Sequence, residues 1–423
     1  MTTTDALPLS ERQQKGLIIA ATMPITQNGA DFVVPSQSLN GKYRVDGSAK
    51  TCSCPDFELR QQPCKHVFAV EYVQRRETTV HPSGATTVTE TKAVRFTYAQ
   101  NWPAYNAAQT TEKEHFVRLL RDLVGAVAEP ERTITGRKPL PLRDMLFSAA
   151  FKVYSGFSGR RSMTDLRAAH SAGLVDRLAS YNSVFRVIES DAVTPILHQL
   201  IEASSLPLRE VEQDFAADST GFGTSTFFRY YSMKYQHEQV GRQWIKTHAM
   251  VGTKTNVVTA VVISGMNEHD SPQFPALVEK TAQNFTMREI SADKAYSGRD
   301  NLALVESHGA LPFIPFRSNA KPDPKAPAWN RLFHLFALNR DGFLAHYHKR
   351  SNVEATFSMV KRVFGDSVRS KTPTAQKNEV LLKIICHNIR CLIHEMHELG
   401  LVPTLEKIVC PKTAGAAPEL LLN

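Results

Sequence analysis

Three cysteines and one histidine lie close together near the start of the chain, as Cys52-x-Cys54 followed after nine residues by Cys64-x-His66. Zinc takes four thiolate and imidazole ligands in a tetrahedral shell, and a shell closed in this way is structural rather than catalytic. The spacing therefore predicts one structural Zn²⁺ held by these four side chains, in a reduced compartment rather than in a disulfide framework. The alternative is a small β-hairpin that buries the three thiols without a metal.

A second set of residues suited to chemistry is acidic and lies in the second half of the chain. Asp218 ends one apolar run, Asp293 ends another, and Glu354 lies on a segment with helical periodicity. Carboxylates at the ends of neighbouring strands, with a third on a following helix, can meet at one sheet edge, where divalent cations relieve their repulsion. Two ions there would support in-line displacement at a phosphodiester. Either aspartate by itself is explained more simply as the cap of a turn.

The glutamate shares an arc of its predicted helix, residues 347–364, with three other polar side chains. At about 100° per residue, Tyr347, Arg350, Glu354 and Lys361 project within roughly 60° of one another. The apolar face that borders them is formed by Val353, Phe357, Val360 and Phe364. Taken alone, the polar arc is a solvated edge of an amphipathic helix. Beside a metal site, Arg350 and Lys361 would instead bind backbone phosphates.

These segments together resemble a known family. Residues 215–222, residues 292–296 and the pattern Tyr347-(2)-Arg350-(3)-Glu354-(6)-Lys361 resemble DDE transposases of bacterial insertion sequences, in the group with a Y-R-E-K signature. The order Asp, Asp, Glu matches, with spacings of 293 − 218 = 75 and 354 − 293 = 61 residues. The resemblance spans roughly residues 112–401. In the same way, the CxC…CxH pattern resembles the SWIM zinc finger, which leaves open whether the finger contacts DNA or protein.

The resemblance implies an RNase H-like catalytic core. It implies that two Mg²⁺ or Mn²⁺ ions are bound by Asp218, Asp293 and Glu354. It also assigns a role in positioning substrate phosphates to Tyr347, Arg350 and Lys361. The implied function is a transposase that binds the terminal inverted repeats, cuts DNA strands and joins them to target DNA, within a synaptic homodimer. The alternatives are a catalytically silent DNA-binding protein of transposase ancestry and an RNase H-like nuclease.

The order of the predicted elements indicates a mixed α/β fold. Helical periodicity dominates residues 112–206, where 166–169, 171–173 and 174–188 have the pattern of a helix, a turn and a helix, either a DNA reader or plain bundle structure. Beyond residue 207, strands are predicted at 215–218, 244–251, 256–264, 287–292 and 311–316. Helices are predicted at 274–282, 301–307, 347–364 and 375–399, and such alternation is typical of layered α/β folds.

We therefore expect four regions. They are a SWIM-type zinc finger region at 1–90, a helical DNA-binding region at 91–206, an RNase H-like DDE catalytic domain at 207–401 and a C-terminal tail at 402–423. Within the first of these, residues 76–98 are predicted to be a linker or an exposed hairpin.

Two further groups of potential ligands have simpler explanations. His387, Cys391 and His394 share one helical face at i, i+4 and i+7, but their apolar neighbours favour a core or half-buried face over a metal. The pair His269-Asp270 has no nucleophile pattern nearby, so we expect a loop or a helix cap rather than a catalytic pair.

The composition excludes several classes of protein. With 423 residues, 42% of them hydrophobic and 22% charged, the chain is neither disordered nor a disulfide miniprotein. No apolar run approaches the ~20 residues of a membrane helix, and no signal peptide is expected, so we expect a cytoplasmic, nucleoid-associated protein and no membrane partner. Fifty basic residues against 41 acidic ones give a net charge of +9, a weak indication of a polyanionic partner.

Overall fold

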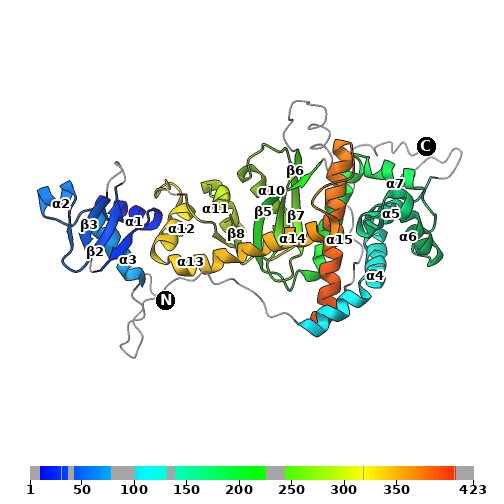
Figure 1. Cartoon of the computed structure of the whole chain (residues 1–423), viewed down its shortest axis with the longest axis horizontal. Coiled ribbons are helices and arrows are strands. Elements are labelled where there is room, and N and C mark those ends of the chain that lie inside the picture. The colour runs from blue at the N-terminus through cyan, green and yellow to red at the C-terminus, as the bar shows by residue number, and fades with distance from the viewer. Residues whose placement is uncertain are drawn as a thin grey trace, which may run out of the picture. The chain divides into compact units, whose positions relative to one another are not determined.

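The structure, a computed structural model, describes residues 10–29, 31–36, 42–77, 101–130, 139–224, 243–317, 319–403 and 405 (Figure 1). The chain divides into two compact units, each built from segments far apart in the sequence. The first unit is Met1–Phe96 with Ser291–Lys349, and the second is Thr97–Ile290 with Arg350–Asn423. Among the described residues, no helix combines the length and the apolar character needed to cross a bilayer.

The first unit contains a small antiparallel sheet with the strand order β1-β2-β3-β4. The strands are β1 (Thr26–Asn28), β2 (Asp31–Pro35), β3 (Lys42–Asp46) and β4 (Thr51–Cys52). Three helices accompany them: α1 (Glu11–Thr22), α2 (Pro55–Arg60) and α3 (Lys65–Glu77). Helix α1 packs closely on α3 at Gly16, where an added Cβ would lie 2.6 Å from the Cβ of Phe68. Only glycine permits this approach.

The rest of the first unit is mostly helical and has an aromatic core. Its elements are the 3₁₀ turn η3 (Lys294–Tyr296), α11 (Arg299–Ser307), β9 (Leu311–Phe313), α12 (Pro327–Leu338) and α13 (Arg340–Tyr347). The ring of Phe316 contacts those of Trp329, Phe333 and Phe336, with centroids 4.8 to 5.7 Å apart. Edge-to-face and tilted contacts of this kind stabilise aromatic cores beyond their buried area.

A five-stranded sheet has the order β7-β6-β5-β8-β9. Its remaining strands are β5 (Asp214–Gly223), β6 (Trp244–Gly252), β7 (Val258–Ser264) and β8 (Glu289–Ala292). Strands β5, β6 and β7 are antiparallel, and Asp218 lies opposite Ala249. Phe215, Ala216 and Ala217 are consecutive and fully buried, which shows that the first half of β5 is covered on both faces.

The second unit is rich in helices. They are α4 (Trp102–Gly125), α5 (Leu142–Ser155), α6 (Gly159–Ser171), α7 (Tyr181–Ile188), α8 (Val193–Ser205), α10 (Phe274–Ala282), α14 (Ser351–Phe364) and α15 (Pro373–Glu398), with the 3₁₀ turns η1 (Leu206–Leu208) and η2 (Ser271–Gln273). Of these helices, α8, α10, α14 and α15 contact the strands β5, β6 or β7. The long helix α15 packs against α4, α5 and α8 and also contacts β7 (Figure 1). It is therefore the central helix of this unit, and the hydrophobic core extends along most of its length.

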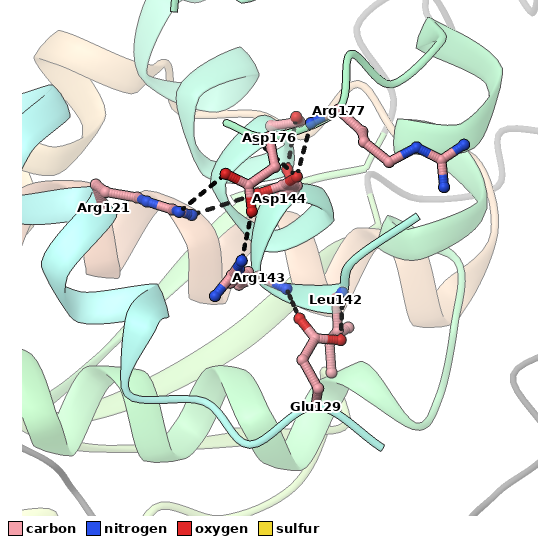
Figure 2. Close-up of polar contacts among 8 residues, drawn as sticks. Arg121, Glu129, Leu142, Arg143, Asp144, Asp176 and Arg177 are labelled. Carbon is pink, nitrogen blue, oxygen red and sulfur yellow. Dashed lines mark hydrogen bonds and ion pairs between the residues drawn. The ribbon is translucent and has the colours of Figure 1, made fainter. Parts of the chain in front are cut away.

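A buried carboxylate organises the connection between α6 and α7. Asp144 on α5 has no exposed surface, and it accepts hydrogen bonds from the backbone N–H groups of Asp176 and Arg177, each at 3.0 Å (Figure 2). It also pairs with Arg121 of α4 at 3.3 Å. These bonds hold residues 176 and 177 outside a helix. The prediction of a second helix beginning at residue 174 is therefore wrong, because α7 begins only at Tyr181.

The mixed α/β class predicted from the sequence is confirmed, and helix α10 has the predicted bounds. Two further element predictions are wrong. Strand β5 does not end at Asp218 but runs five residues further to Gly223. The single helix predicted at 347–364 is broken, because α13 ends at Tyr347 and a 3₁₀ turn η4 (His348–Arg350) precedes α14. Most of the segment 76–98 lies outside the described residues.

Candidate catalytic and zinc sites

Two of the predicted acids lie within reach of one guanidinium. Asp218 is in the middle of β5 and Glu354 is in the first turn of α14. Arg350 lies between them: its Nη1 is 2.5 Å from Oδ2 of Asp218 and its Nη2 is 2.6 Å from Oε1 of Glu354. The pairing with Glu354 follows from their i,i+4 spacing. The pairing with Asp218 joins residues 132 positions apart, so only the tertiary fold produces it.

Lys361 lies on the same side of the site. Its Nζ is 2.6 Å from Oγ1 of Thr220 and 5.5 Å from the ring centroid of Phe222. Thr220 is two residues from Asp218 on β5, and alternate residues of a strand project from the same face. The predicted group of Asp218, Arg350, Glu354 and Lys361 is therefore brought together on one face of β5, beneath α14.

A cavity of about 630 Å³ opens at this face. Its lining residues are Asp218, Ser219, Thr220, Glu354, Phe357, Ser358, Lys361 and Arg362. The side chain of Asp218 is 19% exposed and that of Glu354 is 56% exposed, so a ligand in the cavity can reach both carboxylates. Hard oxygen donors of this kind suit Mg²⁺ or Mn²⁺, and the cavity leaves room for the water and phosphate oxygens that complete such a shell. Asp218 and Glu354 can therefore each offer a carboxylate oxygen to a divalent metal in this cavity.

The segment that follows α14 is hydrogen-bonded to the end of β5. The N–H of Gly223 donates to the carbonyl of Asp366 at 2.9 Å, and the N–H of Val368 donates to the carbonyl of Gly223 at 2.9 Å. Lys383 of α15 donates to the carbonyls of Gly365 and Ser367, at 3.1 and 2.7 Å. Burial lowers the pKa of Lys383 to about 8. Together these bonds fix the helix that carries Glu354 to the strand that carries Asp218.

The other two predicted site residues belong to the first unit. Asp293 directly follows β8, and its Oδ1 accepts a hydrogen bond from the N–H of Lys294 at 2.6 Å as the N-cap of η3. Asp293 therefore caps this turn, as its simpler explanation predicts. A capping role does not conflict with a catalytic role. Tyr347 is the last residue of α13. The convergence of Asp293 and Tyr347 with the other site residues stays a prediction.

Beside Asp218, the structure shows a polar cluster that the sequence did not predict; it consists of Asp270, Lys246, Ser219 and His248. Asp270 stands at the N-cap position of η2 but makes no capping bond. Its Oδ1 instead lies 2.5 Å from Nζ of Lys246, 3.4 Å from Oγ of Ser219 and 3.7 Å from Nδ1 of His248. Burial lowers the pKa of His248. No spacing signal links these residues, because the cluster depends on the β5–β6 register that places Ser219 opposite His248.

The four predicted zinc ligands are brought together in the first unit. All of them are buried, and their ligand atoms lie within 4.8 Å of one another. Nδ1 of His66 is 3.8 Å from the sulfur of Cys52 and 3.8 Å from the sulfur of Cys64. Atoms about 2.3 Å from a shared tetrahedral centre lie about 3.8 Å apart, so the two distances from His66 match a tetrahedral zinc site.

Local structure explains how these ligands converge. Cys52 ends β4, Cys54 is the N-cap of α2, and Cys64 immediately precedes α3. A hydrogen bond from Cys52 lowers the pKa of the Cys64 thiol to about 3, while the pKa of Cys52 itself is raised. The lowered pKa of Cys64 favours the thiolate form that zinc binds. The five cysteines in the described part of the chain are free thiols, in agreement with a metal site rather than disulfides.

Two members of the alternative ligand set on α15, His387 and Cys391, are buried in the core. Nε2 of His387 is 2.9 Å from the carbonyl oxygen of Asn256 and 3.4 Å from the sulfur of Cys391. Burial lowers the pKa of His387 to about 4. His394 instead faces Glu395 and Glu398, at 3.5 and 3.4 Å. The expectation that His387, Cys391 and His394 do not form a metal site is consistent with these contacts.

Comparisons with known proteins agree with this geometry. Residues 209–389 match the family described as a transposase DDE domain, which is RNase H-like, and this range includes Asp218, Asp293 and Glu354. Residues 43–74 match the SWIM zinc finger family, and this range includes all four predicted zinc ligands. These two matches confirm the resemblance inferred from the sequence, to a transposase DDE domain and to a SWIM zinc finger.

One relative is the probable transposase for insertion sequence element ISA1214 of Archaeoglobus fulgidus. The chain is 27% identical to it over 212 residues, which is 50% of this chain. The match spans 63% of the length of that relative.

Proposed function

We propose that this protein is the transposase of an insertion sequence element, which cuts DNA strands at the element ends and joins them to target DNA. The observation that carries the proposal is the pair of carboxylates, Asp218 and Glu354, that meet at one cavity within the DDE segment. The family match supports Asp293 as the third acid.

The site residues have two proposed roles, metal binding and phosphate binding. Asp218, Asp293 and Glu354 would hold two Mg²⁺ or Mn²⁺ ions, which when bound activate the attacking hydroxyl and stabilise the leaving oxygen. Lys361, anchored on Thr220, would fix a non-bridging phosphate oxygen beside the carboxylates. Arg350 and Tyr347 are proposed to orient the substrate backbone. The same site would serve both cleavage by water and strand joining by the freed 3′-hydroxyl.

We propose that the region 91–206 binds the inverted repeats through α6. Arg160, Arg161 and Arg167 are exposed on this helix, and Arg160 and Arg167, seven residues apart, project from the same side of it. Arg160 stacks on the ring of Tyr181, with its guanidinium carbon 5.4 Å from the centroid, and Arg161 lies over Phe157 at 5.3 Å. Guanidinium groups ordered in this way are suited to contact backbone phosphates of duplex DNA.

The remaining assignments are proposals of the same kind. The finger region, 1–90, binds one structural zinc and contacts either DNA or protein, the catalytic domain is 207–401, and residues 402–423 are a tail. The active form is proposed to be a homodimer that holds two element ends.

The proposal is tested by nicking of DNA that carries the flanking inverted repeats, in Mg²⁺ or Mn²⁺. Glu354→Gln should abolish nicking while preserving DNA binding, because the amide removes a metal ligand without changing the side-chain shape. Glu210→Gln is the matched control, since Glu210 is 89% exposed and lies in the same DDE segment. DNA binding without any cutting, identical in wild type and Glu354→Gln, would instead support the silent DNA-binding protein. Cutting without joined target products would support the nuclease.

A further inference from the structure

The position between the two carboxylates is held by a side chain of the protein itself. The guanidinium of Arg350 uses separate nitrogens for Asp218 and for Glu354, at 2.5 and 2.6 Å. The side chain of Arg350 is only 20% exposed. A planar guanidinium is suited to such a two-sided contact, whereas an ammonium group acts as a point charge. Arg350 therefore already neutralises part of the charge that a metal ion would neutralise.

The contact competes with metal binding. A divalent ion shared by Asp218 and Glu354 needs the oxygens that now accept from the arginine, or their immediate neighbours on the same carboxylates. A divalent ion between the two carboxylates repels the guanidinium that lies there, so metal binding weakens both charge-assisted hydrogen bonds. Two other cations line the cavity, Lys361, whose Nζ donates to Oγ1 of Thr220, and Arg362. Arg350 contacts both carboxylates, and it is therefore the competing group.

We propose that Arg350 is the resident counter-cation of the Asp218–Glu354 pair, that divalent metal displaces it, and that the displaced guanidinium then contacts a DNA phosphate. The inference rests on the proposed function and adds an order to it: the metal enters first, and the arginine becomes available to the substrate afterwards. A protein built in this way binds phosphate through Arg350 only when its metal is in place.

The first test is calorimetric titration of the full-length protein with Mn²⁺ in the absence of DNA. Arg350→Gln should bind Mn²⁺ at least about tenfold more tightly than wild type, because two charge-assisted bonds no longer oppose the ion. Arg350→Lys keeps the positive charge but loses the planar guanidinium that contacts both carboxylates. Its Mn²⁺ affinity should therefore lie between those of wild type and Arg350→Gln. Arg362→Gln is the matched control: Arg362 lines the same cavity, is exposed, and makes no ion pair with Asp218 or Glu354 among the described contacts. It should change the affinity less than threefold.

A second test needs no variant and so does not depend on how a substituted protein folds. Wild-type protein is treated with an arginine-specific dicarbonyl reagent with and without Mn²⁺, and modification is quantified by peptide mapping. Modification of Arg350 should increase several-fold when Mn²⁺ is added, while that of Arg362 stays constant.

The outcomes separate this inference from the proposed function. The proposed exchange would be overturned if Arg350→Gln and Arg362→Gln increased the Mn²⁺ affinity equally, or if Mn²⁺ left the modification of Arg350 unchanged. Metal-dependent nicking would still stand. If neither wild type nor Arg350→Gln binds Mn²⁺, the exchange is overturned and the metal-dependent function fails with it.

Discussion

Asn388 of α15 provides the sharpest test of how the sheet is held. Its Oδ1 accepts from the N–H of Val258 at 2.9 Å, and its Nδ2 donates to the carbonyl of Val258 at 2.8 Å and to Oγ of Ser204 at 2.9 Å. Val258 begins β7, the edge strand of the sheet. One fully buried amide thus satisfies both backbone polar groups of an edge residue. Asn388→Leu keeps the branching and the number of side-chain heavy atoms but leaves both groups without that partner.

The magnitude follows from those two groups. Each buried backbone group left unsatisfied costs about 1–3 kcal/mol, and the added apolar burial of leucine offsets about 1–2 kcal/mol. Asn388→Leu should therefore lower the free energy of unfolding by about 3 kcal/mol. Urea denaturation measures this loss, and hydrogen exchange should show faster exchange of the Val258 amide. Lys377→Leu, at an exposed position of the same helix, should change stability by less than about 0.5 kcal/mol. A loss below 1 kcal/mol with the Val258 amide still protected would refute the reasoning.

Three further outcomes are expected. Chelation of zinc, or Cys64→Ser, should release the metal and expose residues 43–74 to rapid hydrogen exchange, because the finger's folding is coupled to its metal; a finger that keeps its protection without zinc would contradict this. His387 has its pKa lowered to about 4, so between pH 6.5 and 4 the unfolded chain binds a proton that the folded chain does not. Lowering the pH from 6.5 to 4 should therefore reduce the free energy of unfolding, by up to about 3 kcal/mol. In thermal melts at several pH values, the stability of His387→Gln should depend less on pH than that of wild type. Lys361→Met should reduce DNA nicking about 10- to 100-fold and should change the Mn²⁺ affinity by no more than about twofold. If nicking and Mn²⁺ affinity decreased by equal factors, Lys361 would act on metal binding instead of on phosphate binding.

The sequence was most informative where ligands are close together along the chain. The zinc set spans residues 52–66, so short elements alone bring its members together, and its spacing predicts the site that the structure contains. Helix α10 was likewise predicted with its bounds, because a compact apolar pattern defines it. The break at 348–350 was not predictable, since helical periodicity continues through η4 without interruption. Tyr347 therefore does not share a helix with Glu354.

The amino-acid sequence by itself determined the chemical types available: a thiol and imidazole quartet for zinc, and carboxylates with flanking cations in the order of a DDE domain. Only the tertiary structure decided that Arg350 bridges Asp218 and Glu354 and that Asp270 pairs with Lys246. The physical reason is that the contacts Arg350–Asp218 and Asp270–Lys246 join segments distant in the chain. Their geometry depends on strand register and helix packing, which no local pattern encodes.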